Sequence, residues 1–130
     1  MSERGSVSVI VLVIAVTVAV LGAALGAFGQ VVAARTRAIA AADAAVLAAA
    51  PVTFRPFGSK GTPAAEAARF ADANGATLIR CDCPVDRSWS ERVVTVEVEV
   101  PIETFGFGAH RVRALGRAEF RPVELLTTDW

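Results

Sequence analysis

The chain of 130 residues offers few side chains that could carry catalytic or metal chemistry. It has two cysteines, Cys81 and Cys83, and a single histidine, His110. A zinc site needs about four ligands, mostly nitrogen and sulfur, and only scattered acids remain to complete one. No nucleophile elbow, phosphate loop or dinucleotide fingerprint is present. We therefore expect a protein that is not an enzyme and that uses neither a cofactor nor a metal.

The two cysteines stand two positions apart in a segment with strand character, so both side chains should point to one face. A disulfide between such near neighbours is strained, although an oxidising compartment permits one. The sequence leaves two alternatives open. Cys81 and Cys83 form a disulfide, with each other or with another chain, or they remain two free thiols.

The charges of the chain balance, with 13 basic and 13 acidic residues. No overall basic field exists that could hold nucleic acid. Arg111, Arg113 and Arg117 could touch an anionic surface, but Glu97 and Glu99 fall nearby and cancel the field. We favour a solvated sheet face over an anion site, and we expect neither a nucleic-acid partner nor a small-molecule substrate.

The elements that position these residues begin with a long apolar segment, because no charged residue occurs between Arg4 and Arg35. As a helix, Ser6 to Ala34 would extend about 43 Å, which exceeds the roughly 30 Å hydrocarbon core of a bilayer. Its many β-branched residues favour a strand in water, but a lone strand cannot satisfy its backbone in lipid. A cleaved signal peptide is the rival interpretation, and the apolar run is long for one.

Nothing stops this helix at the membrane boundary, since an alanine-rich segment follows and the next proline is Pro51. We predict one helix over residues 1–50 that spans the membrane and extends into water. Gly22, Gly26 and Gly29 form a small-residue surface on it, which allows close packing of helices in lipid. Asp43 could pair with an arginine of a neighbouring helix, or it could simply keep an exposed face soluble.

Residues 51–62 are rich in proline and glycine and are predicted to be a linker. Residues 63–130 are predicted to form a small α+β domain with one short helix and a three-stranded antiparallel sheet. The helix should begin at Thr62-Pro63 and end at Asn74-Gly75. The expected strands are Thr77–Cys83, Val93–Ile102 and Ala109–Phe120, and a turn over residues 104–108 would bring Glu97 and Glu99 opposite Arg111 and Arg113 or their neighbours.

The first fifty residues resemble the TadE/TadG-like proteins of tight-adherence (Flp) pilus systems, most closely the small TadE-like minor pilins of actinobacteria. The resemblance rests on Arg4-Gly5-Ser6-Val7-Ser8-Val9 before the apolar run, on Val32-Ala33-Ala34-Arg35-Thr36-Arg37, and on the alanine-rich stretch around Asp43. It implies a single-pass membrane protein with a cytoplasmic N-terminus, an extracytoplasmic pilin-like domain and a role in assembling a pilus or secretion apparatus.

The resemblance also implies a processing site, because pilin-like relatives are cut by a prepilin peptidase after a glycine. Here that site would be Gly5-Ser6, but Ile10 stands where a glutamate normally follows. We therefore expect inefficient or absent cleavage. The implied partners are other pilin-like subunits, the inner-membrane assembly platform and the lipid bilayer. The alternative function is a monomeric, envelope-anchored binding module that docks a partner of a secretion complex.

Overall fold

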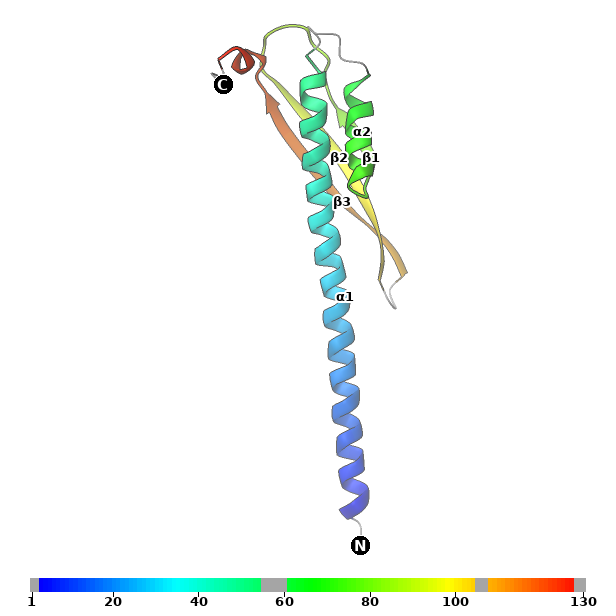
Figure 1. Cartoon of the computed structure of the whole chain (residues 1–130). Helices are drawn as coiled ribbons and strands as arrows, with labels where there is room; N and C mark the ends of the chain where they lie inside the picture. The colour runs from blue at the N-terminus through cyan, green and yellow to red at the C-terminus, as the bar shows by residue number, and fades with distance from the viewer. Residues whose placement is uncertain (1–2, 55–60, 105–107, 128–130) are drawn as a thin grey trace.

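The computed structural model describes residues 3–54, 61–104 and 108–127. The elements are the helices α1 (Glu3–Val52) and α2 (Pro63–Ala73), the strands β1 (Thr77–Asp82), β2 (Arg92–Thr104) and β3 (Gly108–Phe120), and the short 3-10 helix η1 (Pro122–Leu126). Figure 1 shows α1 as a long rod whose upper half packs against the other elements, with the chain ends at opposite ends of the molecule. The predicted α+β fold is therefore confirmed.

Helix α1 is one continuous helix of 50 residues. Its last turn contains Pro51, and two tight turns close it, because the backbone N–H groups of Thr53 and Phe54 donate to the carbonyls of Ala50 and Pro51. The hydroxyl of Thr53 also donates to the carbonyl of Ala50 at 2.6 Å. The predicted continuous helix is thus observed, and it ends where proline removes a backbone donor.

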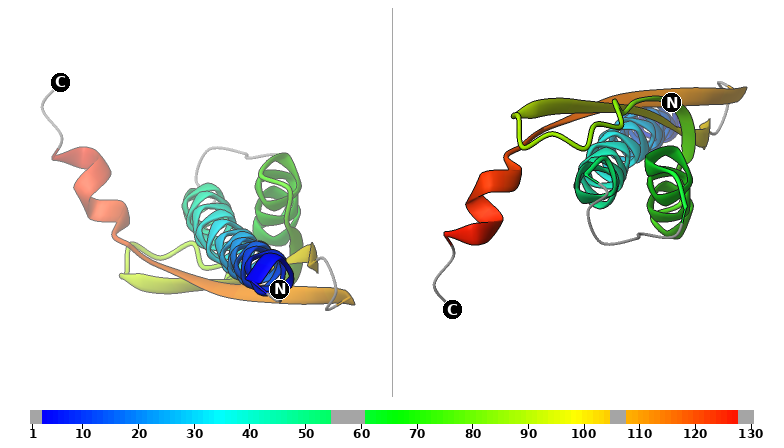
Figure 2. Two further views of the ribbon diagram at one scale, coloured as in Figure 1. Left: turned by 90° about the horizontal axis from the view of Figure 1, so that it is seen from below. Right: turned by 90° about the horizontal axis from the view of Figure 1, so that it is seen from above.

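The sheet has the strand order β1-β2-β3 and is antiparallel throughout. The two views of Figure 2 show α1 and α2 side by side on one face of this sheet. Four alternating valines of β2 point toward the helices and are almost fully buried. These residues are Val94, Val96, Val98 and Val100. Burial of a valine side chain contributes about 1.5–3 kcal/mol, so β2 forms the centre of the core.

Alanines form most of the face that α1 turns toward the sheet. Apart from Val46, the buried residues of α1 in the core cluster are Ala38, Ala41, Ala42, Ala45, Ala49 and Ala50. Of the four larger apolar residues with helical spacing in this part of α1, Val32, Ile39, Val46 and Leu47, only Val46 is buried. The small face lets α1 approach the sheet closely. At Gly116 of β3, an added Cβ would lie 2.5 Å from the carbonyl oxygen of Ala42.

Helix α2 begins and ends at its predicted signals. The hydroxyl of Thr62 accepts a hydrogen bond from the N–H of Ala65, and Gly75 ends the helix with a φ of +72°. Its buried face consists of Pro63, Ala67 and Ala71. Phe70, the one aromatic residue of α2, is half-buried, and the Arg69 guanidinium lies 4.6 Å from its ring centroid.

The β2–β3 hairpin confirms the predicted cross-strand ion pairs. Glu99 lies opposite Arg113 in the register, and its carboxylate accepts a hydrogen bond from Arg111 at 3.0 Å. Arg113 lies 3.5 Å from Glu99 and 3.8 Å from Glu97. The predicted turn residues 105–107 lie outside the described residues. The hairpin reaches beyond β1, which pairs only with residues 95–99 of β2.

Arg92 lies at the start of β2, at the end of the sheet away from the hairpin turn. We did not identify it from the sequence. Arg92 is buried, and its guanidinium donates to the carbonyls of Thr53, Asp86, Ser88 and Ser90. It also lies 5.7 Å from the ring centroid of Phe54, which packs edge-on against Trp89 at 4.8 Å. One side chain therefore ties the end of α1 to the loop before β2.

Candidate interaction surface of helix α1

The N-terminal half of α1 carries no tertiary packing in the described structure. From Val7 to Ala33 every side chain is exposed except the half-buried Ala27, and the first buried residue is Ala34. Among the described residues, α1 is the one helix long and apolar enough to cross a membrane. An apolar surface of this extent is unstable in water, which is consistent with a membrane-anchored segment.

The exposed side of α1 carries a row of mostly small residues with seven-residue periodicity. We name this row the heptad stripe. Its members are Leu12, Ala15, Ala19, Gly22, Gly26, Gly29, Ala33, Thr36, Ala40, Asp43 and Leu47. Every member is exposed, including the last four, which lie where the sheet covers the other side of α1. Such a repeat is typical of helices that pack along their length against another helix.

Over residues 12–22, the composition of α1 differs between the heptad stripe and the remaining positions. Between residues 12 and 22 the stripe holds Leu12 and then only alanine and glycine, whereas the remaining positions are valine, isoleucine, threonine and leucine. This sorting is confined to residues 12–22, because Ala23, Ala24 and Ala27 lie off the stripe. All four helix-packing residues predicted from the sequence, Gly22, Gly26, Gly29 and Asp43, belong to the stripe. The repeat could have been found from the sequence, but we had read only the glycine spacing.

The glycines and Asp43 are all accessible to a partner. A Cβ added at Gly22, Gly26 or Gly29 would meet no atom within 4 Å. Asp43 is exposed, and no described arginine forms an ion pair with it within the chain. The hydroxyl of Thr36 donates to the carbonyl of Val32 at 3.1 Å, so it needs no outside partner. The three glycines therefore leave room for a partner helix to approach, and Asp43 adds one exposed carboxylate.

A groove with both polar and apolar walls accompanies the stripe on the β3 side of α1. It has a volume of about 430 Å³ and lies between Arg35 and Ile39 of α1 and residues 112–115 of β3. Ile39 and Leu115 are 46% and 64% exposed, so apolar surface continues here beyond the membrane-length segment. Together, the groove and the stripe leave one side of α1 exposed from Leu12 to Leu47, so that a partner could contact it there.

The remaining predicted site residues do not gather at this surface. Cys81 and Cys83 are joined by a disulfide at the far edge of the sheet, with their Cα atoms 5.4 Å apart. Gly5 and Ser6 lie in the first turns of α1, and their surroundings lie outside the description. His110 is exposed on β3. In the described part of the chain, no group of three or more histidine, cysteine or acidic residues could hold a metal ion.

The perturbed ionisable groups occur at the end of the sheet where β2 begins and β3 ends. Hydrogen bonds from the Ser88 hydroxyl and backbone N–H hold the pKa of Asp86 below its ordinary value. A hydrogen bond shared between Glu91 and Glu119 raises the pKa of Glu91 and lowers that of Glu119. Arg121, which pairs with both, has a raised pKa. These groups stabilise a loop and the approach to η1, and none lies in a described pocket.

The structure thus shows one apolar helix that continues into the core of a small α+β domain. Residues 5–52 match the family model of the Flp pilus-assembly TadE/G-like proteins, so the resemblance seen in the sequence is confirmed along α1. The match supports a role in pilus assembly, and it does not extend to α2 or the sheet. No curated protein and no solved structure gives a significant match to the chain.

Proposed function

We propose that this protein is a non-enzymatic, membrane-anchored minor pilin-like subunit of a tight-adherence pilus or secretion assembly. Helix α1 spans the membrane once, with its N-terminus in the cytoplasm and the sheet domain outside. Its partners are other pilin-like subunits and the inner-membrane assembly platform. The family match over residues 5–52 supports the pilus context.

The observation that carries the subunit role is the heptad stripe. It runs from the membrane segment past the start of the sheet domain without interruption, and the domain covers none of it. Small residues allow two helix backbones to approach closely in lipid, where apolar burial supplies no net drive for association. In the aqueous part of the same interface, Asp43 would form an ion pair with an arginine of the neighbouring subunit. A helix of another subunit therefore fits along the whole stripe.

Processing at Gly5 is not needed for this role. Because Ile10 replaces the glutamate that usually follows the cleavage site, we propose that the full-length chain is the working form. Intact-mass measurement of the native protein tests this. A mature N-terminus at Ser6 would contradict it.

Co-purification from the native cell, after cross-linking through a C-terminal tag, tests the subunit role. We expect the chain to bring down pilin-like subunits, the pilin-type ATPase and the inner-membrane platform. The Gly26→Leu variant should lose the pilin-like subunits, because a large side chain separates the helices. Ala24→Leu, on the other side of α1, is the matched control and should retain them.

The exposed apolar end of the molecule favours the second candidate function, a monomeric binding module. Val123, Leu125 and Leu126 of η1 are 50%, 58% and 73% exposed. If Leu126→Ser abolished capture of an envelope protein while Gly26→Leu had no effect, the binding module would be the better description. The two variants lie at opposite ends of the chain, so their effects are separable.

A further inference from the structure

A second cleft beside α1 lies on the side away from β3, where the end of β2 faces the helix. It has a volume of about 300 Å³. Its walls include Gln30, Ala34 and Arg37 from α1 and Pro101, Ile102 and Glu103 from β2. Neither the heptad packing nor the pilus role accounts for this cleft.

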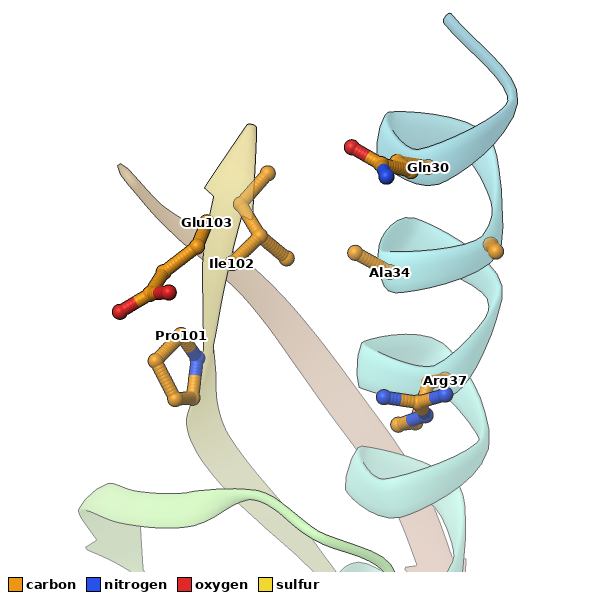
Figure 3. Close-up of a pocket in the computed structure, with 7 residues that line it drawn as sticks. Gln30, Ala34, Arg37, Pro101, Ile102 and Glu103 are labelled. Atoms are coloured by element: carbon orange, nitrogen blue, oxygen red, sulfur yellow. The ribbon is translucent and has the colours of Figure 1, made fainter. Parts of the chain in front are cut away.

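The walls of the cleft differ in chemistry. Figure 3 shows the Gln30 amide extending from α1 toward β2, Ile102 extending from β2 toward α1, and Arg37 on the same helix as Gln30. Glu103 points away from the helix in the same view. No described residue forms an ion pair with Arg37. The helix wall therefore offers hydrogen-bond donors and a positive charge, and the strand wall offers apolar surface.

The position of Arg37 is set by its neighbours. Its Cδ lies 3.9 Å from where a Cβ of Gly75 would be, so the aliphatic part of the side chain passes beside the turn between α2 and β1. Side chains on a helix also lean toward the helix N-terminus, which here is the direction of the membrane segment. Arg37 therefore borders the cleft at the end farthest from the exposed segment of α1.

The level of the cleft along α1 corresponds to the headgroup layer of a bilayer. The exposed segment from Val7 to Ala33 is about 40 Å long as a helix. A bilayer with its headgroups is about 40–45 Å thick. Gln30 and Ala34 therefore lie at the outer boundary of the span, and Arg37 lies two turns above Gln30.

We propose that this cleft binds the phosphate of a phospholipid from the bilayer leaflet on the side of the sheet domain. The guanidinium of Arg37 donates two parallel hydrogen bonds to phosphate oxygens, a geometry that suits this side chain. The Gln30 amide donates a third bond. Ile102 and Ala34 contact the glycerol and the first methylene groups. This inference depends on the proposed membrane span of α1.

Such a lipid would link the sheet to the membrane surface. Strand β1 pairs with β2 only as far as Glu99, so the part of β2 that lines the cleft has no strand partner on that side. A phospholipid bound between helix and hairpin would fix the angle at which the domain stands above the bilayer.

Arg35 provides a matched control for Arg37. It lies two positions away on the same helix and carries the same charge, but it lines the groove beside β3. A general attraction between arginines and anionic lipid would involve both residues equally. Binding in the cleft involves Arg37 alone.

The experiment uses the full chain, purified in detergent and stripped of lipid, and titrated with dioleoylphosphatidylglycerol under native mass spectrometry. We expect one lipid to bind per chain. Arg37→Gln should weaken binding about tenfold, the usual size of the loss of a charge-assisted hydrogen bond. Gln30→Leu should weaken it several-fold, and Arg35→Gln less than about twofold. Unchanged melting temperatures would show that all three variants fold.

Four outcomes would overturn the proposal. They are equal binding by Arg37→Gln and wild type, equal losses in Arg37→Gln and Arg35→Gln, equal binding of dioleoylglycerol, which has no phosphate, and displacement of the lipid by equimolar inorganic phosphate. Flotation with phosphatidylcholine vesicles separates this proposal from the span. A chain that floats with the vesicles but binds no lipid in the titration contradicts only the lipid site in the cleft. A chain that does not float contradicts the membrane span of α1 as well.

Discussion

At the scale of single residues, Gly116 determines how closely α1 approaches the sheet. The nearest atoms to an added Cβ would be the carbonyl oxygen and carbon of Ala42, at 2.5 and 2.7 Å. Both belong to the helix backbone, so neither can rotate away. This contact lies near the middle of the buried alanine face of α1, which runs from Ala38 to Ala50.

Gly116→Ala is therefore expected to destabilise the domain by about 1–3 kcal/mol, the usual cost of overpacking a core. In most strand positions the same change would be neutral or stabilising, because glycine weakens strands. Thermal unfolding of the full chain in detergent, followed by circular dichroism, measures the effect. Gly29→Ala is the control, since nothing lies within 4 Å of its added Cβ. Equal melting temperatures for the two variants would contradict the close approach.

Asp86 makes the loop before β2 sensitive to acid. Its carboxylate accepts hydrogen bonds from the Ser88 N–H at 2.8 Å and from the Ser88 hydroxyl at 2.6 Å, and the charge of Arg92 adds to their effect. These bonds favour the ionised form and lower its pKa in the folded state. A lowered pKa contributes stability that is present above the unfolded value and lost as the pH falls through the folded one.

We expect the melting temperature of the wild type to fall more steeply below about pH 4 than that of Asp86→Asn. At pH 7 the variant should be less stable, because the charged acceptor is gone. Melting curves between pH 2.5 and 7 give the comparison. Asp72→Asn, an exposed change of the same charge on α2, should follow the wild-type slope. Parallel curves for wild type and Asp86→Asn would argue against this role.

At the scale of elements, some features could be predicted from the sequence because their signals are local. Thr62-Pro63 and Asn74-Gly75 mark the ends of α2, and the alternating valines mark β2. The core face of α1 could not be predicted, because it is built from alanines and the whole segment is rich in alanine. The role of Arg92 was also beyond the sequence, since one of its bonds reaches Thr53, which is 39 residues away. Helix η1 was not predicted, although Pro122 stands at its start.

The heptad stripe leads to a prediction about association of α1 in the membrane. Gly22→Leu and Gly26→Leu should weaken association between helices, because each places a large side chain where two backbones approach. Ala24→Leu and Val20→Leu lie off the stripe and should have little effect. A genetic reporter of association between membrane spans, carrying the α1 segment, measures all four. Equal signals would mean that the small residues only face lipid.

At the scale of the whole molecule, α1 is both the apolar segment and part of the domain core. Residues 34–50 pack under the sheet while residues 7–33 remain exposed, so a single rigid helix connects the two regions. Movement of residues 7–33 is therefore transmitted to the sheet without an intervening hinge. This continuity suits the proposed subunit role, in which a neighbouring helix contacts α1 along both regions.

The same continuity makes the topology testable, because the side on which the sheet domain lies follows from the orientation of one helix. Charge alone does not set that orientation, since Arg4 flanks one end of the apolar run and Arg35 and Arg37 flank the other. The Cys81–Cys83 disulfide favours an oxidising compartment for the domain.

A reporter that is active only outside the cytoplasm, fused after Trp130, is expected to be active, and the same reporter fused before Met1 is expected to be silent. Activity of a cytoplasm-only reporter after Trp130 would reverse the orientation. The proposed phospholipid would then come from the cytoplasmic leaflet, and the extracytoplasmic pilin-like role would no longer hold.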